Sequence, residues 1–346
     1  MKNLTFIYTI CGIKKMNKYL VISIIAFITA FPSCSDNREQ RNKSAKEKAP
    51  YTIAVIPKGT VHEFWKSVHA GAIQASRETG TKIIWKGPIR EDDREEQIQL
   101  IEEFVGSDID AIVLAPLDNR ALLMPVREAK NRGIPTVIID SDLEGDAQIS
   151  FVATDNYLGG VMAAHRIADI LKGSGKVIII RYLEGSASNT NRENGFRDTL
   201  RDKYPAIQIL SDNQYVGPTV ETAYRGSENL LNRFPEVDAI FTPNEPLTFG
   251  CLRALEERGL AGKVYLVGFD VSAKLIEGLR NKTIHGLVLQ DPFKMGYLGV
   301  MTSVQYLDGK DVDKRIDTGV TLVTTENIDN PDIKELYSRD LSVYFK

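Results

Sequence analysis

Short apolar runs alternate with longer amphipathic stretches along residues 51–323. In the first half of the chain, four such runs predict β-strands at 51–56, 82–85, 111–114 and 136–139. Between them, apolar residues recur every three or four positions over 61–78, 91–104 and 119–132, which predicts helices. Strands that alternate with helices of this length predict a parallel sheet with helices on both faces.

The stretch from Phe151 to Ala164 divides the pattern into two halves. A short apolar strand runs into Thr154-Asp155-Asn156, residue types that cap helix N-termini, and a helical pattern follows to Leu171. The alternation then resumes, and it predicts strands at 176–180, 207–210, 239–242, 264–267, 286–289 and a closing strand at 318–323. Residues 186–194 form a polar loop that enters a helix ending at Lys203, and further helices are predicted at 219–234, 247–258, 272–281 and 293–307. We interpret the stretch as the crossing between two α/β halves.

The N-terminal residues have the pattern of a targeting segment. Lys14, Lys15 and Lys18 precede a nearly continuous apolar run from Tyr19 to Phe31, which suits a signal peptide better than a membrane span. Met16 is an alternative start. The following Pro32-Ser33-Cys34-Ser35 resembles a bacterial lipoprotein signal, which implies cleavage after residue 33 and a lipid on Cys34. An ordinary secretory peptide with an incidental cysteine is the alternative. Residues 34–50, polar and charged, are expected to be a flexible tether.

The composition is that of a soluble globular protein of two domains. Of the 346 residues, 43% are hydrophobic and 26% are charged, and the net charge is −3. This charge gives no reason to expect a nucleic-acid partner or an anionic membrane surface. Of the three cysteines, only Cys251 follows the leader segment, so no internal disulfide is expected and Cys251 is interpreted as a small core residue.

Polar residues recur just beyond the predicted strands, where ligands of open α/β sheets bind. These residues are Asp140, Asn156, Asn244, Asp270 and Gln290, with Arg192 at the opening of a helix. Adjacent aromatics follow the first strand in His62-Glu63-Phe64-Trp65, and neighbours on a helix cannot both face the core. Carboxylates, amides and a guanidinium can pair with the hydroxyls of a sugar, and flat rings can stack on its C–H faces.

With these residues assembled, the chain resembles the periplasmic sugar-binding proteins of ribose type, which share their fold with the ligand-sensing part of LacI-type repressors. The resemblance extends from about Tyr51 to Val323. The stretches that carry it are Glu63-Phe64-Trp65, Ile134–Asp140, Thr154-Asp155-Asn156 through Gly160, Asn191–Phe196, Val267–Asp270 and Thr318–Val323. Their order and spacing together make the resemblance specific.

The resemblance implies a set of ligand-binding residues. Phe64 and Trp65 match the ring-stacking aromatics of the family, and the polar positions match its carboxylates, amides, arginine and hinge glutamine. The implied set is Phe64, Trp65, Asp140, Asn156, Arg192, Asn244, Asp270 and Gln290, and we add His62 and Ser141 as candidates. Three positions depart from the ribose binders: Ala115 replaces an Asn, Ser141 replaces an Arg, and Pro218 or its neighbour Tyr215 replaces a Phe. The departures favour a sugar other than ribose.

The implied fold is α/β, with two doubly wound parallel-sheet domains joined by a three-crossing hinge, the type I periplasmic-binding-protein fold. The first lobe is expected to comprise residues 51–153 and 291–319, and the second 154–290 and 320–346. The crossings fall near Ala153, Gln290 and 317–321, and ligand is expected to favour the closed form. The resemblance also implies a monomer in the periplasm, held at the membrane only by its lipid anchor.

An enzyme is not expected. The four histidines are spread over different segments without metal-ligand spacing, and no Ser or Cys lies in a nucleophile motif. Gly173-Ser174-Gly175-Lys176 matches only part of a phosphate-binding loop, and no cofactor or metal is expected. The expected function is to bind a monosaccharide or similar polyol and deliver it to the membrane permease of an ABC importer. The alternatives are a sensor that feeds a kinase or chemoreceptor, and a receptor for a furanose-like signal molecule.

Overall fold

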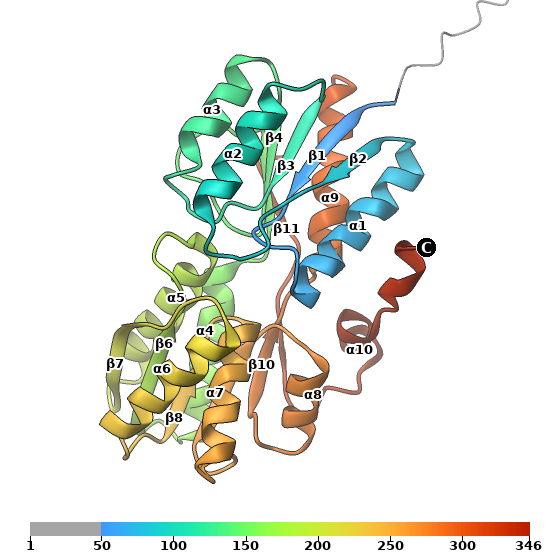
Figure 1. The fold of residues 1–346 in the computed structure, drawn as a ribbon. Coiled ribbons are helices and arrows are strands. Elements are labelled where there is room, and N and C mark those ends of the chain that lie inside the picture. Colours follow the sequence, from blue (N-terminus) through green and yellow to red (C-terminus); the bar gives the residue numbers. More distant parts are fainter. Residues whose placement is uncertain (1–49) are drawn as a thin grey trace, which may run out of the picture. The chain divides into compact units, whose positions relative to one another are not determined.

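The computed structural model describes residues 50–346 (Figure 1). The predicted signal peptide at 1–33, the lipidation site Cys34 and the tether residues 34–49 lie outside the described residues. Within them the strands form two six-stranded sheets. We name the part built on the first sheet lobe 1, and the part built on the second sheet lobe 2.

The sheet of lobe 1 is parallel throughout and has the order β11-β5-β4-β3-β1-β2. Its strands are β1 (Thr52–Ile56), β2 (Lys82–Trp85), β3 (Ala111–Leu114), β4 (Thr136–Ile139), β5 (Ser150–Ala153) and β11 (Arg315–Asp317). β3 and β4 are buried on both faces, as is typical of a parallel sheet between two helical layers.

Four helices cover this sheet: α1 (Glu63–Thr79), α2 (Arg94–Val105), α3 (Leu123–Asn131) and α9 (Pro292–Leu307). Side chains of α1 and α9 pack on one face, in a cluster that includes Val68 and Val300. Side chains of α2 and α3 pack on the other, with Ile101 and Val126. The pairing of α1 with α9 joins segments far apart in sequence, as Figure 1 shows.

The sheet of lobe 2 repeats this arrangement, in the order β12-β10-β9-β8-β6-β7. Its strands are β6 (Gly175–Arg181), β7 (Ile207–Tyr215), β8 (Ala239–Phe241), β9 (Tyr265–Phe269), β10 (Gly286–Leu289) and β12 (Thr321–Val323). Only β12 is antiparallel to its neighbour, so this sheet is parallel except at one edge.

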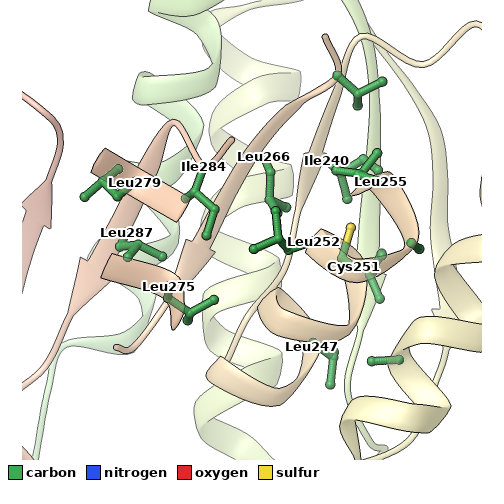
Figure 2. Close-up of a cluster of buried hydrophobic side chains, with 14 of the residues drawn as sticks. Ile240, Leu247, Cys251, Leu252, Leu255, Leu266, Leu275, Leu279, Ile284 and Leu287 are labelled. Carbon is green, nitrogen blue, oxygen red and sulfur yellow. The ribbon is translucent and has the colours of Figure 1, made fainter. Parts of the chain in front are cut away.

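The helices of lobe 2 are α4 (Asn156–Ile170), α5 (Ala187–Lys203), α6 (Val220–Arg233), α7 (Glu245–Glu257) and α8 (Ala273–Arg280). α4 and α5 cover one face of the sheet, and α6, α7 and α8 cover the other. Figure 2 shows Cys251 of α7 among the leucine and isoleucine side chains of the second core. It is fully buried, and burial raises the pKa of its thiol to about 12, so the prediction of a core cysteine is confirmed.

The chain passes between the lobes where the hinge is predicted. β5 ends at Ala153 and α4 begins at Asn156, while β10 ends at Leu289 and α9 begins at Pro292. The third passage corrects one prediction, because only Thr321–Val323 of the closing strand expected at 318–323 is a strand, β12. The strand before it, β11, belongs to the other sheet. Gly319, with φ of 91°, separates β11 from β12. Next to it, the Thr154 hydroxyl donates to the Gly319 carbonyl over 3.0 Å and ties the first passage to the third.

The sequence pattern did not predict the two elements of the C-terminal segment, α10 and η1. Helix α10 (Pro331–Ser338) packs on lobe 2, where Ile333 joins the core. The chain then reaches lobe 1 and forms η1 (Leu341–Tyr344), a 3₁₀ helix. There the Arg77 guanidinium of α1 donates to the Tyr344 carbonyl over 3.1 Å, and the Phe345 ring lies 5.2 Å from that of His69. Residues 341–346, expected in lobe 2, thus contact lobe 1 (Figure 1).

Candidate ligand-binding site

One cavity of about 790 Å³ lies where the carboxyl ends of strands from both sheets meet. Eight of the predicted site residues line it: His62, Phe64, Trp65, Asp140, Arg192, Asn244, Asp270 and Gln290. Lobe 1 contributes the first four and lobe 2 the next three, while Gln290 belongs to the second passage between the lobes. Strand ends far apart in sequence therefore converge on one space.

Lys58, which the sequence reasoning missed, is the closest partner of Asp140. Its ammonium nitrogen lies 2.6 Å from Asp140 Oδ2, and both side chains are about 95% buried, with exposed fractions of 4% and 5%. The same nitrogen donates to the Ser188 hydroxyl of α5 over 3.1 Å, which links the lobes. Lys58 follows β1 directly after Pro57, so the rule that polar residues beyond strand ends bind ligands would have found it.

Arg192 is held on three sides in lobe 2. Its Nε donates to Asn156 Oδ1 over 2.8 Å, and its Nη1 donates to the Pro243 carbonyl over 2.8 Å. The guanidinium carbon lies 4.3 Å from the centroid of the Phe269 ring, a cation–π contact. These contacts fix the planar fork at the cavity wall, so little side-chain freedom remains to be lost on binding.

Asp140 and Asp270 occupy equivalent positions in the two lobes. Asp140 follows β4 with φ of 60°, and Asp270 follows β9 with φ of 62°. Each backbone N–H donates to a carbonyl of the neighbouring strand, at Val152 and Val288 respectively. This left-handed conformation is uncommon for residues other than glycine, although aspartate tolerates it, and it is frequent at functional sites.

The Asp270 carboxylate lies between Gln290 and Arg192. Gln290 Nε2 donates to Oδ1 over 2.6 Å, and Arg192 Nη1 lies 3.8 Å from Oδ2. Burial raises the pKa of Asp270, and the nearby Arg192 opposes this rise. Two buried polar atoms of this group, Arg192 Nη2 and Gln290 Oε1, have no hydrogen-bond partner among the described residues. Such atoms are rare in folded proteins and indicate a place where a ligand or water completes the bonding.

Phe64 and Trp65 both line the cavity, with their rings edge-to-face at a centroid distance of 4.9 Å. Trp65 is only 2% exposed, and its indole N–H donates to Glu91 Oε1 over 2.6 Å. The other oxygen of Glu91 accepts from the Tyr182 hydroxyl of lobe 2 over 2.7 Å. Glu91, which was also missed, therefore connects an aromatic of the site to the opposite lobe.

His62 lines the cavity between two carboxylates. Its ring nitrogens are each 3.9 Å from a carboxylate oxygen, one of Glu91 and one of Glu245. Burial raises the pKa of Glu245. Asn244 caps α7 by accepting from the Leu247 N–H, and its amide donates to Asn189 Oδ1 over 3.2 Å. Both predicted residues are therefore engaged with lobe 2 groups.

Asn156 and Ser141 are buried beside the cavity and are not among the residues that line it. The Asn156 amide nitrogen donates to the Asp140 carbonyl over 3.3 Å, while its oxygen accepts from Arg192. The Ser141 hydroxyl accepts from the Ser188 N–H of lobe 2 over 3.1 Å. Their contacts position the residues on the wall, and direct contact with a ligand stays a prediction for both.

The start of α5 corrects another prediction. Residues 186–194, expected to be a polar loop, are helical from Ala187 onward. Ser188, Asn189, Arg192 and Glu193 are buried, so the inward face of this turn is polar and the apolar period that predicts a helix is missing. Glu193 receives the Arg181 Nε–H over 2.6 Å, and burial raises its pKa. From this polar turn, Ser188 and Asn189 line the cavity beside Arg192.

Two positions that depart from the ribose binders, Ala115 and Tyr215, are not among the residues that line the cavity. Ala115 is fully buried in the lobe 1 core, and Tyr215 lies under the Arg181 guanidinium at 4.4 Å.

Among residues 50–346, no three His, Cys, Asp or Glu side chains are placed to hold a metal ion. No helix among these residues is both long and apolar enough to cross a membrane.

The sequence of residues 53–311 matches the family model described as the periplasmic binding protein domain. The chain belongs to this family. Its fold is similar to that of a carbohydrate transporter solute-binding protein from Agrobacterium radiobacter in complex with D-arabinose, which superposes with a TM-score of 0.81. That structure shares 34% identity with this chain and covers 84% of it and 100% of its own length. The predicted family and two-domain α/β fold are therefore confirmed.

Two further proteins are similar to this chain. An ABC transporter solute-binding protein from Agrobacterium vitis with bound D-fucose is 35% identical, has a TM-score of 0.78, and covers 83% of this chain and 99% of its own. The ribose import binding protein RbsB of Bacillus subtilis is 26% identical over 307 residues, which are 88% of this chain and 97% of that protein. All three relatives carry sugar-related names.

Proposed function

We propose that this periplasmic binding protein binds a monosaccharide or similar polyol in its cavity, closes around it and delivers it to an ABC-type sugar importer. The observation that carries the proposal is the convergence of two buried cations, two buried carboxylates and several amides on one cavity between two lobes. Lys58, Asp140, Arg192, Asp270 and Gln290 are its central members.

This combination suits hydroxyl groups, because each sugar hydroxyl can donate to a carboxylate and accept from a cation or amide. Asp140 beside Lys58 and Asp270 beside Arg192 present such pairs from the two lobes. Phe64 and Trp65 provide flat apolar surface for the C–H face of a sugar ring. We therefore assign binding to Phe64, Trp65, Asp140, Arg192, Asn244, Asp270, Gln290 and His62, with Lys58 added, and a supporting role to Asn156 and Ser141.

The charge of the cavity favours a neutral sugar. Six acidic residues line it against three lysines and arginines. Burial raises the pKa of both Asp270 and Glu245, which shows that their environment already disfavours negative charge. An added carboxylate or phosphate on the ligand would meet this excess, so we expect sugar acids and sugar phosphates to bind poorly.

Ligand contacts on both lobes would stabilise the closed arrangement, since a ligand shifts a conformational equilibrium by its differential affinity. The three passages at Ala153–Asn156, Leu289–Pro292 and Asp317–Thr321, which connect the two lobes, are the proposed hinge. The role is binding and delivery without bond-making or a cofactor. The names of the relatives support an importer as the partner.

We also propose that the chain is a periplasmic monomer anchored by a lipid on Cys34. The support is the N-terminal sequence, with its basic and apolar segments ahead of Cys34. Expression with labelled palmitate tests the anchor, and Cys34→Ala is expected to abolish labelling and release the protein from membranes. Labelling that persists in Cys34→Ala would contradict the assignment.

The first test is a thermal-shift panel of pentoses, hexoses, inositols and sugar alcohols on residues 50–346. A ligand at about 100 times its Kd adds roughly 2.7 kcal/mol to stability, which raises Tm by several degrees. The rise is expected to disappear in Arg192→Ala and to persist in Arg120→Ala, an exposed arginine outside the cavity. The matching uronic acid of the bound sugar should give no rise. A panel without any rise would overturn the sugar assignment.

Delivery is tested separately by uptake of the labelled sugar in cells with and without the gene. Uptake that depends on the chain supports an importer. Binding in vitro with unchanged uptake would instead favour the sensor or signal-receptor role.

A further inference from the structure

The cavity is larger than a monosaccharide requires. A water molecule in the liquid takes about 30 Å³, and the roughly twelve non-hydrogen atoms of a hexose, being covalently bonded, take less than about 360 Å³. The cavity has about 790 Å³, more than twice that volume. Pockets of about 300–1,000 Å³ typically bury most of the surface of a drug-sized ligand, which is larger than a monosaccharide.

The walls of the cavity fall into two groups of different chemistry. The polar residues already described contact one another at the strand ends, for example Lys58 with Asp140 and Gln290 with Asp270. A second group is apolar and comes from the start of α1, from α8 and from the C-terminal segment. This group, which we call the outer wall, consists of Val61, Phe64, Ile276, Leu336, Tyr337 and Leu341.

The outer wall is held in place from both lobes. Ile276, Leu336 and Tyr337 pack on the lobe 2 core, and the Tyr337 hydroxyl donates to the Ile328 carbonyl over 3.1 Å. On the other side, the Arg339 guanidinium carbon lies 3.9 Å from the centroid of the Phe293 ring of lobe 1. The C-terminal segment is therefore an ordered part of the cavity, and it follows the last strand of the two sheets.

We propose that the outer wall is a second subsite, which takes an apolar or aromatic substituent attached to the sugar bound at the strand ends. The ligand class is then a glycoside with an apolar aglycone. This inference rests on the proposed sugar-binding function and deepens it. The occupant follows from continuity, because both groups of residues line one cavity, and from the partly or fully exposed apolar surface that water would otherwise cover.

The test compares methyl and phenyl glycosides, in both anomers, of D-arabinose, D-fucose and D-ribose by calorimetric titration. We expect one phenyl glycoside to bind at least tenfold more tightly than its methyl counterpart. In Tyr337→Ala and in Leu341→Ser this preference should fall to within about twofold. Tyr306→Ala, which removes an exposed tyrosine of α9 outside the cavity, should keep the preference of the unaltered protein.

The outcomes separate the two proposals. If the free sugars bind but no phenyl glycoside exceeds its methyl counterpart, the subsite is overturned and the sugar site stands. If the preference exists but survives in both folded variants, the outer wall is not its cause and the assignment fails. If neither free sugars nor glycosides bind, both proposals fail. Melting curves show whether each variant is folded. If Tyr337→Ala does not fold, Leu341→Ser alone provides the test.

Discussion

Lys58 and Asp140 form an ion pair of 2.6 Å with both side chains almost completely removed from solvent. A charge in this environment depends on its partner, because neither the core nor the cavity wall can replace lost hydration. Each charge therefore requires the other to remain buried, and the pair presents a donor beside an acceptor to the cavity.

We expect Asp140→Asn to lower the free energy of unfolding by about 3–5 kcal/mol, because it leaves the Lys58 ammonium buried without a counter-charge. Asparagine retains the shape of the side chain and tolerates the left-handed backbone, so the change isolates the charge. Urea unfolding monitored by circular dichroism measures the effect.

The matched control is the exposed pair Lys86–Glu103, where Glu103→Gln should change stability by less than about 1 kcal/mol. The double variant Lys58→Met with Asp140→Asn should recover much of the loss. An equally small effect at Asp140 and Glu103 would show that the buried pair is not a stabilising unit.

Glu91 connects the lobes through Trp65 on one side and Tyr182 on the other. Hydrogen bonds to charged groups contribute about 1.5–3 kcal/mol each, so Glu91→Ala should shift the unliganded protein toward the open form by at least tenfold. Without ligand, small-angle scattering should then give a larger radius of gyration for Glu91→Ala than for the unaltered protein. With saturating ligand, the two proteins should have the same radius. Glu95→Ala, an exposed change on α2, should leave the radius unchanged.

Gly160 lets α4 approach α5 at the position of Arg192. A Cβ added at Gly160 would lie 2.0 Å from the Arg192 carbonyl oxygen. Gly160→Ala should therefore lower stability by about 1–3 kcal/mol or more and also weaken sugar binding, because it displaces the backbone that carries Arg192. In Gly106→Ala, where the nearest atom is at an ordinary 3.5 Å, ligand affinity should be unaffected. If a folded Gly160→Ala protein bound the sugar with normal affinity, the packing of α4 on α5 at Gly160 would not be needed to position Arg192.

Two partly buried histidines predict how stability depends on pH. Burial lowers the pKa of His69 and of His285 to about 4, from about 6.5 in an unfolded chain. Between pH 6.5 and 4 the unfolded chain thus binds protons that the folded chain does not, so stability falls as the pH drops through this window. Allowing for partial exposure, we expect a loss of about 1–2 kcal/mol for each histidine.

Unfolding free energies of His69→Phe at several pH values test this expectation. Phenylalanine keeps a ring against Trp85, whose ring stacks on His69 at 4.2 Å, but it cannot be protonated. The slope of stability against pH should decrease in His69→Phe. Identical slopes in both proteins would exclude His69 as a source of acid sensitivity.

The sequence predicted the architecture and eight of the residues that line the cavity, because both depend on the ends of apolar strands. In a parallel sheet the carboxyl ends lie at one edge, so Asp140, Asn244 and Asp270 could be placed without knowing side-chain positions. Linear spacing carries no information on depth, so it could not indicate that Asn156 is bonded to Arg192 and is absent from the cavity lining.

Other features were missed for identifiable reasons. The first turn of α5 faces a polar cavity, so its inward residues lack the apolar period on which helix prediction depends. Lys58 follows Pro57 in what reads as an ordinary loop, and its partner Asp140 is 82 positions away. Helix α10 is short, and only Ile333 of its residues is buried, so the signal in the pattern is weak.

The route of the C-terminal segment has a practical consequence. The first described residue, Pro50, precedes β1 of lobe 1, and the last residues pack against α1 of the same lobe. Both described ends of the chain therefore belong to lobe 1, and lobe 2 is attached only through internal segments. Fluorescent proteins fused to these two ends would both move with lobe 1. The distance between them would therefore not change when ligand binds. A sensor built from this protein needs one of its two fluorophores inserted within lobe 2, for example at the exposed residues Asn281 and Lys282 between α8 and β10.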